Sequence, residues 1–584
     1  MRRIFFLVGV LIATLLAPAT ATAAQNFTIN FSDHFSSGTV QSMITSSKQM
    51  ASMMGNGYYL CSSLDDPKCS QAADITAILP MCSGSTDAYC IESLNITSNK
   101  STAGAATVLK TIGKRQFSAD AAKGLPEGSH ETLFEVPGLK TAGEQSLYAV
   151  RVKVDLVSFP GVGVIATDFS ASVVPYENST TSSSDPEVRE SVDPQGKTSV
   201  GVFISDTNNT CVWIENGACG KETKFPDGAK VTLTLHMANY LTTWMHGRLT
   251  EQSITLSQLT PKQNRIVVQA KPLEIQGSSI TLSTDKVDPA MLNNFRDANG
   301  FLHEGDISQM VETSQDGTLP YFKGFETDLG DKSKTLTSTW SFRSLSGSML
   351  SDPSMALAVM TNNTAALSSA LSAAIVKNSG LGSMASACLP QASTLAGAIL
   401  GQNSITDLIG LVTTSAMVYG AGPPTFKDGA LDYQVAGLHF NPDGTVFSGR
   451  YDLLMNKTIA KCMYGFGPNV PVYADVQLVN SDGTARVTTA ILSEDANWLK
   501  LGVYGITFSS PTVRIKLREV GSTTPTPSAS PSASASPSAS ASPSPSATKV
   551  AVAKKSTITC TKAKVMKRVT AVNPKCPNGY KLKK

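Results

Sequence analysis

The stretch SLYAVRVKVD, from Ser146 to Asp155, shows most clearly which kind of fold this chain adopts. Tyr148, Val150, Val152 and Val154 occupy every second position, and Ala, Arg, Lys and Asp fill the positions that follow them. A period of two residues is that of a β-strand with one face buried and the other in contact with water. The stretch therefore predicts a half-buried strand.

Similar strand patterns recur on both sides of this stretch. The candidates are Val162 to Thr167, Ser199 to Ile204, Lys230 to His236, Ser253 to Leu259, Asn264 to Ala270 and Ser279 to Leu282. Short strands separated by Gly, Pro and Asn turns are typical of a β-sandwich. Residues 131–285 are therefore expected to form a β-sandwich-like domain, with a hairpin turn at Asn216-Gly217.

The alternating pattern returns in residues 426–520, which we expect to form an antiparallel β domain. Val472, Ala474, Val476 and Leu478 share one face of a strand, and Asp443-Gly444 and Asp482-Gly483 mark turns. Strands at Trp498 to Phe508 and Thr512 to Leu517 would complete a meander. The chain is thus predicted to be mainly β and multidomain.

Residues 286–425 form a mixed region with an Ala/Ser-rich helical insert, Ser354 to Val418. Leu367, Leu371 and Ile375 repeat at helical spacing. Ser404-Ile-Thr-Asp407 resembles a capping box that would open a second helix through Leu408, Ile409 and Val412. Polar residues interrupt each apolar run before 18 residues accumulate, which favours core helices over membrane insertion.

The first 24 residues have the pattern of a signal peptide. Arg2 and Arg3 precede an apolar run from Ile4 to Leu16, and small residues around Ala23 and Ala24 offer cleavage sites. That run is shorter than the roughly 20 residues needed to span a bilayer, so no transmembrane segment is expected after cleavage. The sequence therefore predicts a secreted protein.

The ten Cys residues of an exported chain are candidates for disulfides. Spacing indicates Cys61–Cys69, Cys82–Cys90, Cys211–Cys219 and Cys560–Cys576, which leaves Cys388 and Cys462 to pair over a distance. The first two pairs would pin an irregular N-terminal region, residues 25–130, that carries some helix. Zinc is the alternative, but no C-x-x-C occurs and no His lies beside a Cys at ligand spacing.

One of these pairs conflicts with the predicted hairpin. A two-residue turn at Asn216-Gly217 would place Cys211 opposite Glu222 and not opposite Cys219. Either the loop is longer or this pairing is wrong.

The C-terminal part separates into a linker and a basic tail. Residues 521–549 contain a run of 27 residues, Ser522 to Thr548, made only of Ser, Pro, Ala and Thr. Such a run has too little apolar surface to offset the entropy of ordering, so disorder is expected. Residues 550–584 would form a small disulfide-closed hairpin.

Charge divides the chain at the same place. Of the 48 Lys and Arg residues, 11 lie from Lys549 onward, where there is no Asp or Glu. Because Arg2 and Arg3 belong to the leader, the body keeps 35 basic against 45 acidic residues, a net charge of −10. The residues expected to make the tail a basic surface are Lys562, Lys564, Lys567, Arg568, Lys575, Lys581, Lys583 and Lys584.

A tail of this charge would bind a polyanion in a salt-dependent way. Tyr580 is its only aromatic residue for stacking, so nucleic acid is a poor partner. An anionic cell-wall polymer or polysaccharide suits a secreted protein better. The alternative is a solvated basic terminus without a specific partner.

Several motifs resemble uncharacterised secreted and envelope proteins of actinobacteria with a Ser/Pro/Ala linker and a basic two-Cys tail. They are Trp244-Met-His-Gly-Arg248, Tyr451-Asp-Leu-Leu, Ala460-Lys-Cys-Met-Tyr-Gly-Phe466, Ile558-Thr-Cys and Asn573-Pro-Lys-Cys-Pro-Asn-Gly-Tyr580. The resemblance is sharpest in Gly422 to Leu517 and in the tail. It implies an envelope or extracellular location and no activity, cofactor or catalytic residue.

No catalytic motif stands out. The chain contains no G-x-S-x-G, H-E-x-x-H or P-loop pattern, and the S-x-x-K match at Ser283 has no accompanying motifs. Trp244, His246 and Arg248 are the best candidate ligand-binding group, for an anion or a sugar, although such residues more often close a sandwich edge. Asp297 to Asp306 could bind calcium but fits ordinary turns better.

These observations predict a secreted, envelope-associated binding or adhesion protein, retained at the surface by its basic tail. No metal site, cofactor or catalytic residue is assigned. One alternative is a secreted hydrolase of extracellular polymers, with a site assembled from distant carboxylates or from His246 and its neighbours. The other is a structural envelope component, for which self-association is expected.

Overall fold

The computed structural model describes most of the body and parts of the tail. The described residues are 26–31, 40–48, 51, 57–70, 72–85, 87–159, 163–181, 183–204, 211–238, 244–260, 263–284, 305–306, 332–344, 385–388, 408–419, 423–437, 441, 445–467, 472–479, 485–487, 490–494, 497–506, 512–519, 556–562, 565–571, 575–576 and 580–582. The leader, the Ser/Pro/Ala run, most of the predicted helical insert and most of the calcium candidate lie outside them.

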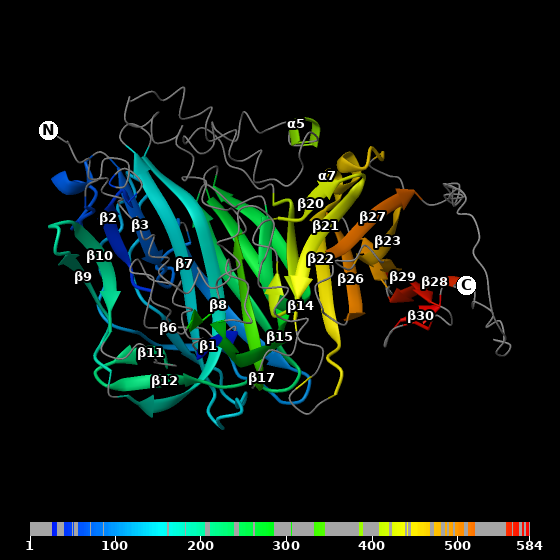
Figure 1. Ribbon diagram of the computed structural model, residues 1–584, viewed down its shortest axis with the longest axis horizontal. Helices are drawn as coiled ribbons and strands as arrows, with labels where there is room; N and C mark the ends of the chain where they lie inside the picture. The colour runs from blue at the N-terminus through cyan, green and yellow to red at the C-terminus, as the bar shows by residue number, and fades with distance from the viewer. Residues whose placement is uncertain are drawn as a thin grey trace, which may run out of the picture.

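One long sheet, here called the central sheet, runs through the molecule (Figure 1). Its strands in spatial order are β2 (Met43–Ser46), β3 (Ala73–Ile78), β7 (Leu147–Phe159), β8 (Gly163–Thr180), β17 (Lys332–Ser344), β14 (Trp244–Thr260), β18 (Gly410–Thr414), β22 (Gly449–Asn456), β26 (Trp498–Ile506), β25 (Ala490–Glu494), β29 (Val565–Ala571), β28 (Ser556–Lys562) and β30 (Lys581–Leu582). All neighbours are antiparallel except β14 and β18, which are parallel.

Shorter strands flank the first half of the central sheet. β5 (Thr107–Thr111) and β6 (Thr132–Glu135) extend it beside the start of β7, and the hairpin of β11 (Cys211–Glu215) and β12 (Ala218–Glu222) extends it beside the end of β8. β9 (Glu187–Val192) and β10 (Thr198–Phe203) form a separate hairpin.

The predicted strand at Ser146 to Asp155 is confirmed as part of β7, but the expectation that its second face contacts water is wrong at Ala149 and Arg151, which are buried. Tyr148, Val150, Val152 and Val154 are all fully buried on one face of it. They pack against a second sheet made of β4 (Cys90–Ser98), β13 (Ala229–Ala238), β15 (Gln263–Ser283) and the second half of β14. This is the first sandwich, and its core holds most of the buried apolar side chains of the N-terminal half.

The first sandwich draws its strands from two regions that the sequence separated. β3 and β4 come from residues 25–130, whereas their partners β7 and β13 come from residues 131–285. The paired strands share a single hydrophobic core. The N-terminal region is therefore pinned by sheet pairing as well as by its disulfides.

Three long strands pass from one sheet into another, and this joins the sheets. β14 pairs with β17 up to Arg248 and with β15 from Leu249 onward. β15 in turn pairs with β17 from Leu273 onward, and its end pairs with β1 (Asn26–Phe31), which also pairs with β16 (Gly305–Asp306). The three strands thus meet at one junction.

A second sandwich uses the opposite face of the central sheet. β18, β22, β26 and β25 face a sheet of β19 (Val418–Tyr419), β20 (Thr425–Lys427), β21 (Ala430–Ala436), β27 (Thr512–Glu519), β23 (Val472–Val479) and β24 (Ala485–Val487). The helices α7 (Lys457–Met463) and α5 (Ala385–Cys388) are joined to each other by a disulfide. The expected C-terminal meander is therefore a pair of facing sheets, and the mainly β, multidomain class is confirmed.

The predicted helix through Leu408 and Val412 is wrong in its described part, because Gly410–Thr414 is strand β18. Every residue of β18 is buried. Leu411 packs in the first core and Val412 in the second, so both faces of the strand are apolar. A short strand buried on both faces has no alternation, and periodicity does not distinguish it from a buried helix. Met43–Ser46 lies in the N-terminal region that was expected to carry some helix, and it is likewise a strand.

All five predicted disulfides are confirmed. The two-residue turn at Asn216-Gly217 also exists, and a β-bulge reconciles it with the Cys211–Cys219 bond. Because the register shifts between Cys211 and Trp213, Cys211 pairs with Lys221 and comes within reach of Cys219. Neither a longer loop nor a different pairing is needed.

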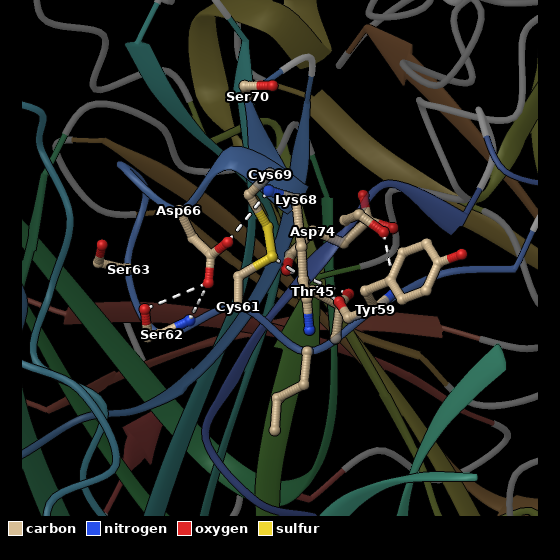
Figure 2. Close-up of a disulfide and its surroundings, with 12 residues drawn as sticks. Thr45, Tyr59, Cys61, Ser62, Ser63, Asp66, Lys68, Cys69, Ser70 and Asp74 are labelled. Atoms are coloured by element: carbon tan, nitrogen blue, oxygen red, sulfur yellow. Dashed lines mark hydrogen bonds between the residues drawn. A yellow bond between two sulfur atoms is a disulfide. The ribbon is translucent and has the colours of Figure 1, made fainter. Parts of the chain in front are cut away.

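The Cys61–Cys69 disulfide illustrates how these bonds hold loops (Figure 2). It closes a loop that ends in the short helix η1 (Pro67–Cys69). The carboxylate of Asp66 accepts hydrogen bonds from the backbone and hydroxyl of Ser62 and from the backbone of Lys68. Both sulfur residues are buried against the first core.

Candidate functional site

Trp244, His246 and Arg248 lie at alternate positions of β14 and therefore share one face of the central sheet. His246 pairs with Arg343 of β17 and with Val412 of β18. The three side chains are buried, with exposed fractions of 0, 2 and 4 %. Trp244 packs in the second core and therefore presents no ring face on which a sugar could stack.

The side chains of His246, Arg248 and Arg343 gather around the ring of Tyr419. The His246 and Tyr419 rings stack with centroids 3.6 Å apart and planes 10° apart. The guanidinium carbons of Arg248 and Arg343 lie 4.6 and 5.7 Å from the same ring centroid. Cations over an aromatic face are attracted by its electron density. Tyr419 therefore holds three basic side chains from β14 and β17 in one cluster.

Arg248 also fixes the segment that connects β18 to β19. Its Nη1 donates to the carbonyls of Thr414 and Ala416 at 2.8 and 2.6 Å, and its Nη2 donates to the carbonyl of Met417 at 3.2 Å. Burial, and then the charges of Arg248 and Arg343, hold the pKa of His246 well below its usual range. The His246 ring is therefore neutral near pH 7, and its Nε2 has no hydrogen-bond partner among the described residues.

The cluster belongs to a wider polar band on the same face of the sheet. Two adjacent rows cross β7, β8, β17 and β14; they are Arg151, Ser172, Ser341 and Arg248, and Lys153, Ser170, Arg343 and His246. Guanidinium, ammonium and hydroxyl groups are the donors that recognise anions. At the β7 end, acidic partners already occupy them: Arg151 forms a buried ion pair with Glu131, and Lys153 lies 2.8 Å from Asp155. Ion pairs therefore occupy the β7 end of the band.

A second polar cluster surrounds Asp452 of β22, on the opposite face of the central sheet from His246. Tyr504 donates to Oδ1 of Asp452 at 2.9 Å, and Nε of Arg450 is 3.8 Å from Oδ2. Burial raises the pKa of Asp452 to about 6, although Arg450 and the Tyr504 hydrogen bond oppose the shift. Oδ2 of Asp452 and Oγ1 of its cross-strand partner Thr413 have no hydrogen-bond partner among the described residues. A carboxyl group that titrates near neutral pH is suited to proton transfer.

One group of potential metal ligands is present in the described part of the chain. Cys82, Cys90 and His236 have ligand atoms within 4.8 Å of one another. The sulfurs are joined to each other in a disulfide, which leaves no thiolate to bind a metal. Sequence spacing missed this His because it reaches the cysteines through the pairing of Cys90 on β4 with His236 on β13.

The second sandwich encloses a small apolar space. Its lining consists of Leu431, Leu453, Met455, Leu492, Leu499, Leu501, Ile515 and Leu517. Ligand sites combine apolar walls with a few polar groups that fix orientation, and this lining has none. The space is therefore a packing feature of the second core and not a site for a polar substrate.

The basic tail forms a small antiparallel unit at the end of the central sheet. β28 pairs with β29 and β30, and Cys560 is bonded to Cys576. β29 continues the sheet by pairing with β25 over three residue pairs, Ile491 to Ser493. Lys575 and Lys581 are exposed. The tail therefore presents positive charge at the opposite end of the molecule from β2 and β3 (Figure 1).

Sequence reasoning found two members of the Tyr419 cluster, His246 and Arg248, but missed Tyr419 and Arg343. Tyr419 is 173 positions from His246 in the chain and lies on β19 of the facing sheet, so no sequence spacing relates the two residues. Asp452 was missed because it sits in an apolar strand, YDLLM, and a single acidic residue in such a strand is the signal that would have identified it.

Comparisons with known proteins assign no family to this chain. No protein-family model matches it, and no curated protein matches it. The resemblance to actinobacterial envelope proteins therefore stays a prediction. Within the described residues, none of the helices has the length and hydrophobicity needed to span a bilayer.

Proposed function

We propose that this protein binds anionic polymers of the cell envelope through its basic tail, and that its acidic body is a binding or adhesion module displayed there. The observation that carries the proposal is the tail itself. It is a disulfide-closed unit with exposed Lys575 and Lys581, and its chain segment carries 11 positive and no negative side chains.

The charge of the body makes the tail the segment that attracts polyanions. The body carries a net charge of −10, so it repels an anionic polymer, and only the tail segment is strongly positive. Interactions between exposed charges weaken beyond roughly 10 Å at 0.1 M salt. Binding through the tail is therefore expected to be strong at low ionic strength and weak at high ionic strength.

Two further features support an extracellular location. Five disulfides are typical of proteins from oxidising compartments. The N-terminal sequence has the three regions of a signal peptide. Envelope association follows in the proposal from the combination of export with a polyanion-binding tail.

Cell fractionation tests this function. The test variant has all 11 Lys and Arg residues from Lys549 onward replaced by Gln, which preserves chain length, Cys560 and Cys576. The control carries 11 Gln substitutions at exposed Lys and Arg positions of the body. We expect the tail variant, and the wild type washed at high salt, to move from the surface fraction to the medium, while the control stays at the surface. Unchanged partitioning of the tail variant would contradict the proposal.

A secreted hydrolase remains the second candidate, because the structure contains one carboxyl group of suitable acidity. Asp452 is buried with a pKa of about 6 and is hydrogen-bonded to Tyr504, whose ring is partly exposed. Screening the purified protein against polysaccharide, peptide and ester substrates tests this function. Turnover that Asp452→Asn abolishes, with folding intact, would favour the enzyme; absence of turnover on all three classes would favour the binding protein.

A further inference from the structure

The Cys82–Cys90 disulfide lies beside a buried histidine. Cys90 on β4 and His236 on β13 are cross-strand partners, and the two sulfurs and a ring nitrogen of His236 lie within 4.8 Å of one another. This is the only disulfide with a His in such a group in the described part of the chain. A His next to sulfur matters because a positive charge there stabilises a thiolate.

Both ring nitrogens of His236 lie at hydrogen-bond distance from an acceptor oxygen. Nδ1 is 3.1 Å from the carbonyl oxygen of Asp87, and Nε2 is 3.0 Å from Oε2 of Glu92. The pKa of Glu92 is lowered, mainly by its hydrogen bonds with Arg265, so Glu92 is an ionised acceptor. A carbonyl and a carboxylate accept but do not donate, so both contacts are hydrogen bonds at the same time only when the ring carries two protons and a positive charge.

The two cysteine residues differ in exposure. Cys90 is buried beside His236, whereas Cys82 is half-buried. An attacking thiol therefore reaches Cys82, and Cys90 is the leaving sulfur. A leaving thiolate next to an imidazolium is the more stable one, and stable thiolates leave faster.

We propose that Cys82–Cys90 is a redox-active disulfide, which exchanges with external thiols and uses His236 to stabilise the Cys90 thiolate. An external thiolate attacks Sγ of Cys82, and the Cys82–Cys90 bond breaks as the new bond forms. Cys90 leaves as a thiolate beside the imidazolium. A second external thiolate then attacks the mixed disulfide and releases Cys82. The protein disulfide is reduced by two electrons, and two thiols are oxidised to one external disulfide.

The chain contains matched internal controls. Cys61–Cys69 and Cys211–Cys219 have the same sequence separation of 8 as Cys82–Cys90. Equal separation gives an equal loop-closure contribution to disulfide stability. Both cysteines of each control pair are buried, and neither pair has a His at metal-ligand distance in the described residues. A difference in redox behaviour would therefore report on the surroundings of Cys82–Cys90.

The test equilibrates the full-length oxidised protein with graded ratios of reduced to oxidised dithiothreitol. Free thiols are then alkylated, and peptide mass spectrometry scores each disulfide. We expect the equilibrium constant for reducing Cys82–Cys90 to exceed that of both controls by about tenfold, which corresponds to roughly 30 mV. Reduction of Cys82–Cys90 together with or after the controls would overturn the proposal.

A variant and a pH series assign the effect to His236. His236→Gln removes the charge, and we expect it to abolish the tenfold advantage without changing reduction of the controls. In the wild type, the ratio of Cys82–Cys90 to control reduction should vary with pH, because the stabilising pair needs a Cys90 thiolate and a positively charged His236 ring at the same time. The charged groups facing His236 are Glu92 on β4, Arg265 on β15 and Asp87 in the disulfide loop. A ratio independent of pH would contradict the role of His236, even where the variant fails to fold.

Discussion

Replacing Asp452 by Asn should remove a pH dependence of stability that the structure allows us to size. Burial raises the pKa of this carboxyl from 3.8 to about 6. Each pKa unit corresponds to about 1.4 kcal/mol, so the ionised side chain costs the folded protein about 3 kcal/mol above pH 6. The folded state holds this proton more tightly than the unfolded chain does. Protonation therefore increases the free energy of unfolding as the pH falls from 6 to 4.

Urea unfolding at pH 8, 6 and 4.5 measures this contribution. We expect the wild type to gain about 2 kcal/mol from this group between pH 8 and pH 4.5, and Asp452→Asn to lose that gain. Asp475→Asn is the matched control, because Asp475 lies on β23 and its side chain is 44 % exposed. If Asp452→Asn and Asp475→Asn change the pH dependence equally, the assigned burial of the Asp452 charge is wrong.

Two further predictions concern the stability of the sandwiches. Arg151→Met should lower the free energy of unfolding by about 3–5 kcal/mol, because it leaves the buried charge of Glu131 without its partner. Adding Glu131→Leu should recover most of that loss. Urea titration of both variants shows whether it does. Joint replacement of Cys388 and Cys462 by Ala should lower the free energy of unfolding by about 4–5 kcal/mol, because this disulfide closes a loop with a separation of 74 residues. Calorimetry should show a lower unfolding temperature for the second sandwich. An unchanged unfolding temperature would refute the entropic account.

The strands that sequence reasoning predicted best are those with one apolar and one polar face. β7 is the clearest case, because its Tyr and Val side chains enter the first core while Lys153 and Asp155 stay half-exposed. β18 failed for the opposite reason. It lies between two cores, so apolar residues occupy both of its faces and the alternation disappears.

The association of the strands was less predictable than their existence. β14 belongs to two sheets, and no residue type marks the change between Arg248 and Leu249. The candidate residues Trp244, His246 and Arg248 were correctly placed on one strand face by their spacing of two. Tyr419 contacts His246 and Arg248, and a one-dimensional pattern cannot bring it to them.

The disulfides were the most predictable long-range contacts, because an even number of cysteines leaves few pairings once the short loops are closed. The same reasoning missed the neighbourhood of Cys82–Cys90. His236 is 146 positions from Cys90 in the chain, and only the antiparallel pairing of β4 with β13 places them together.

Binding of the purified full-length protein to dextran sulfate and to neutral dextran of equal length tests the proposed function most directly. The proposal predicts binding to the sulfated polymer alone, strong at 50 mM salt and lost at 500 mM, and abolished when the 11 basic tail residues become Gln. Equal binding to both polymers, or undiminished binding by the Gln variant, would contradict a tail that recognises polyanions.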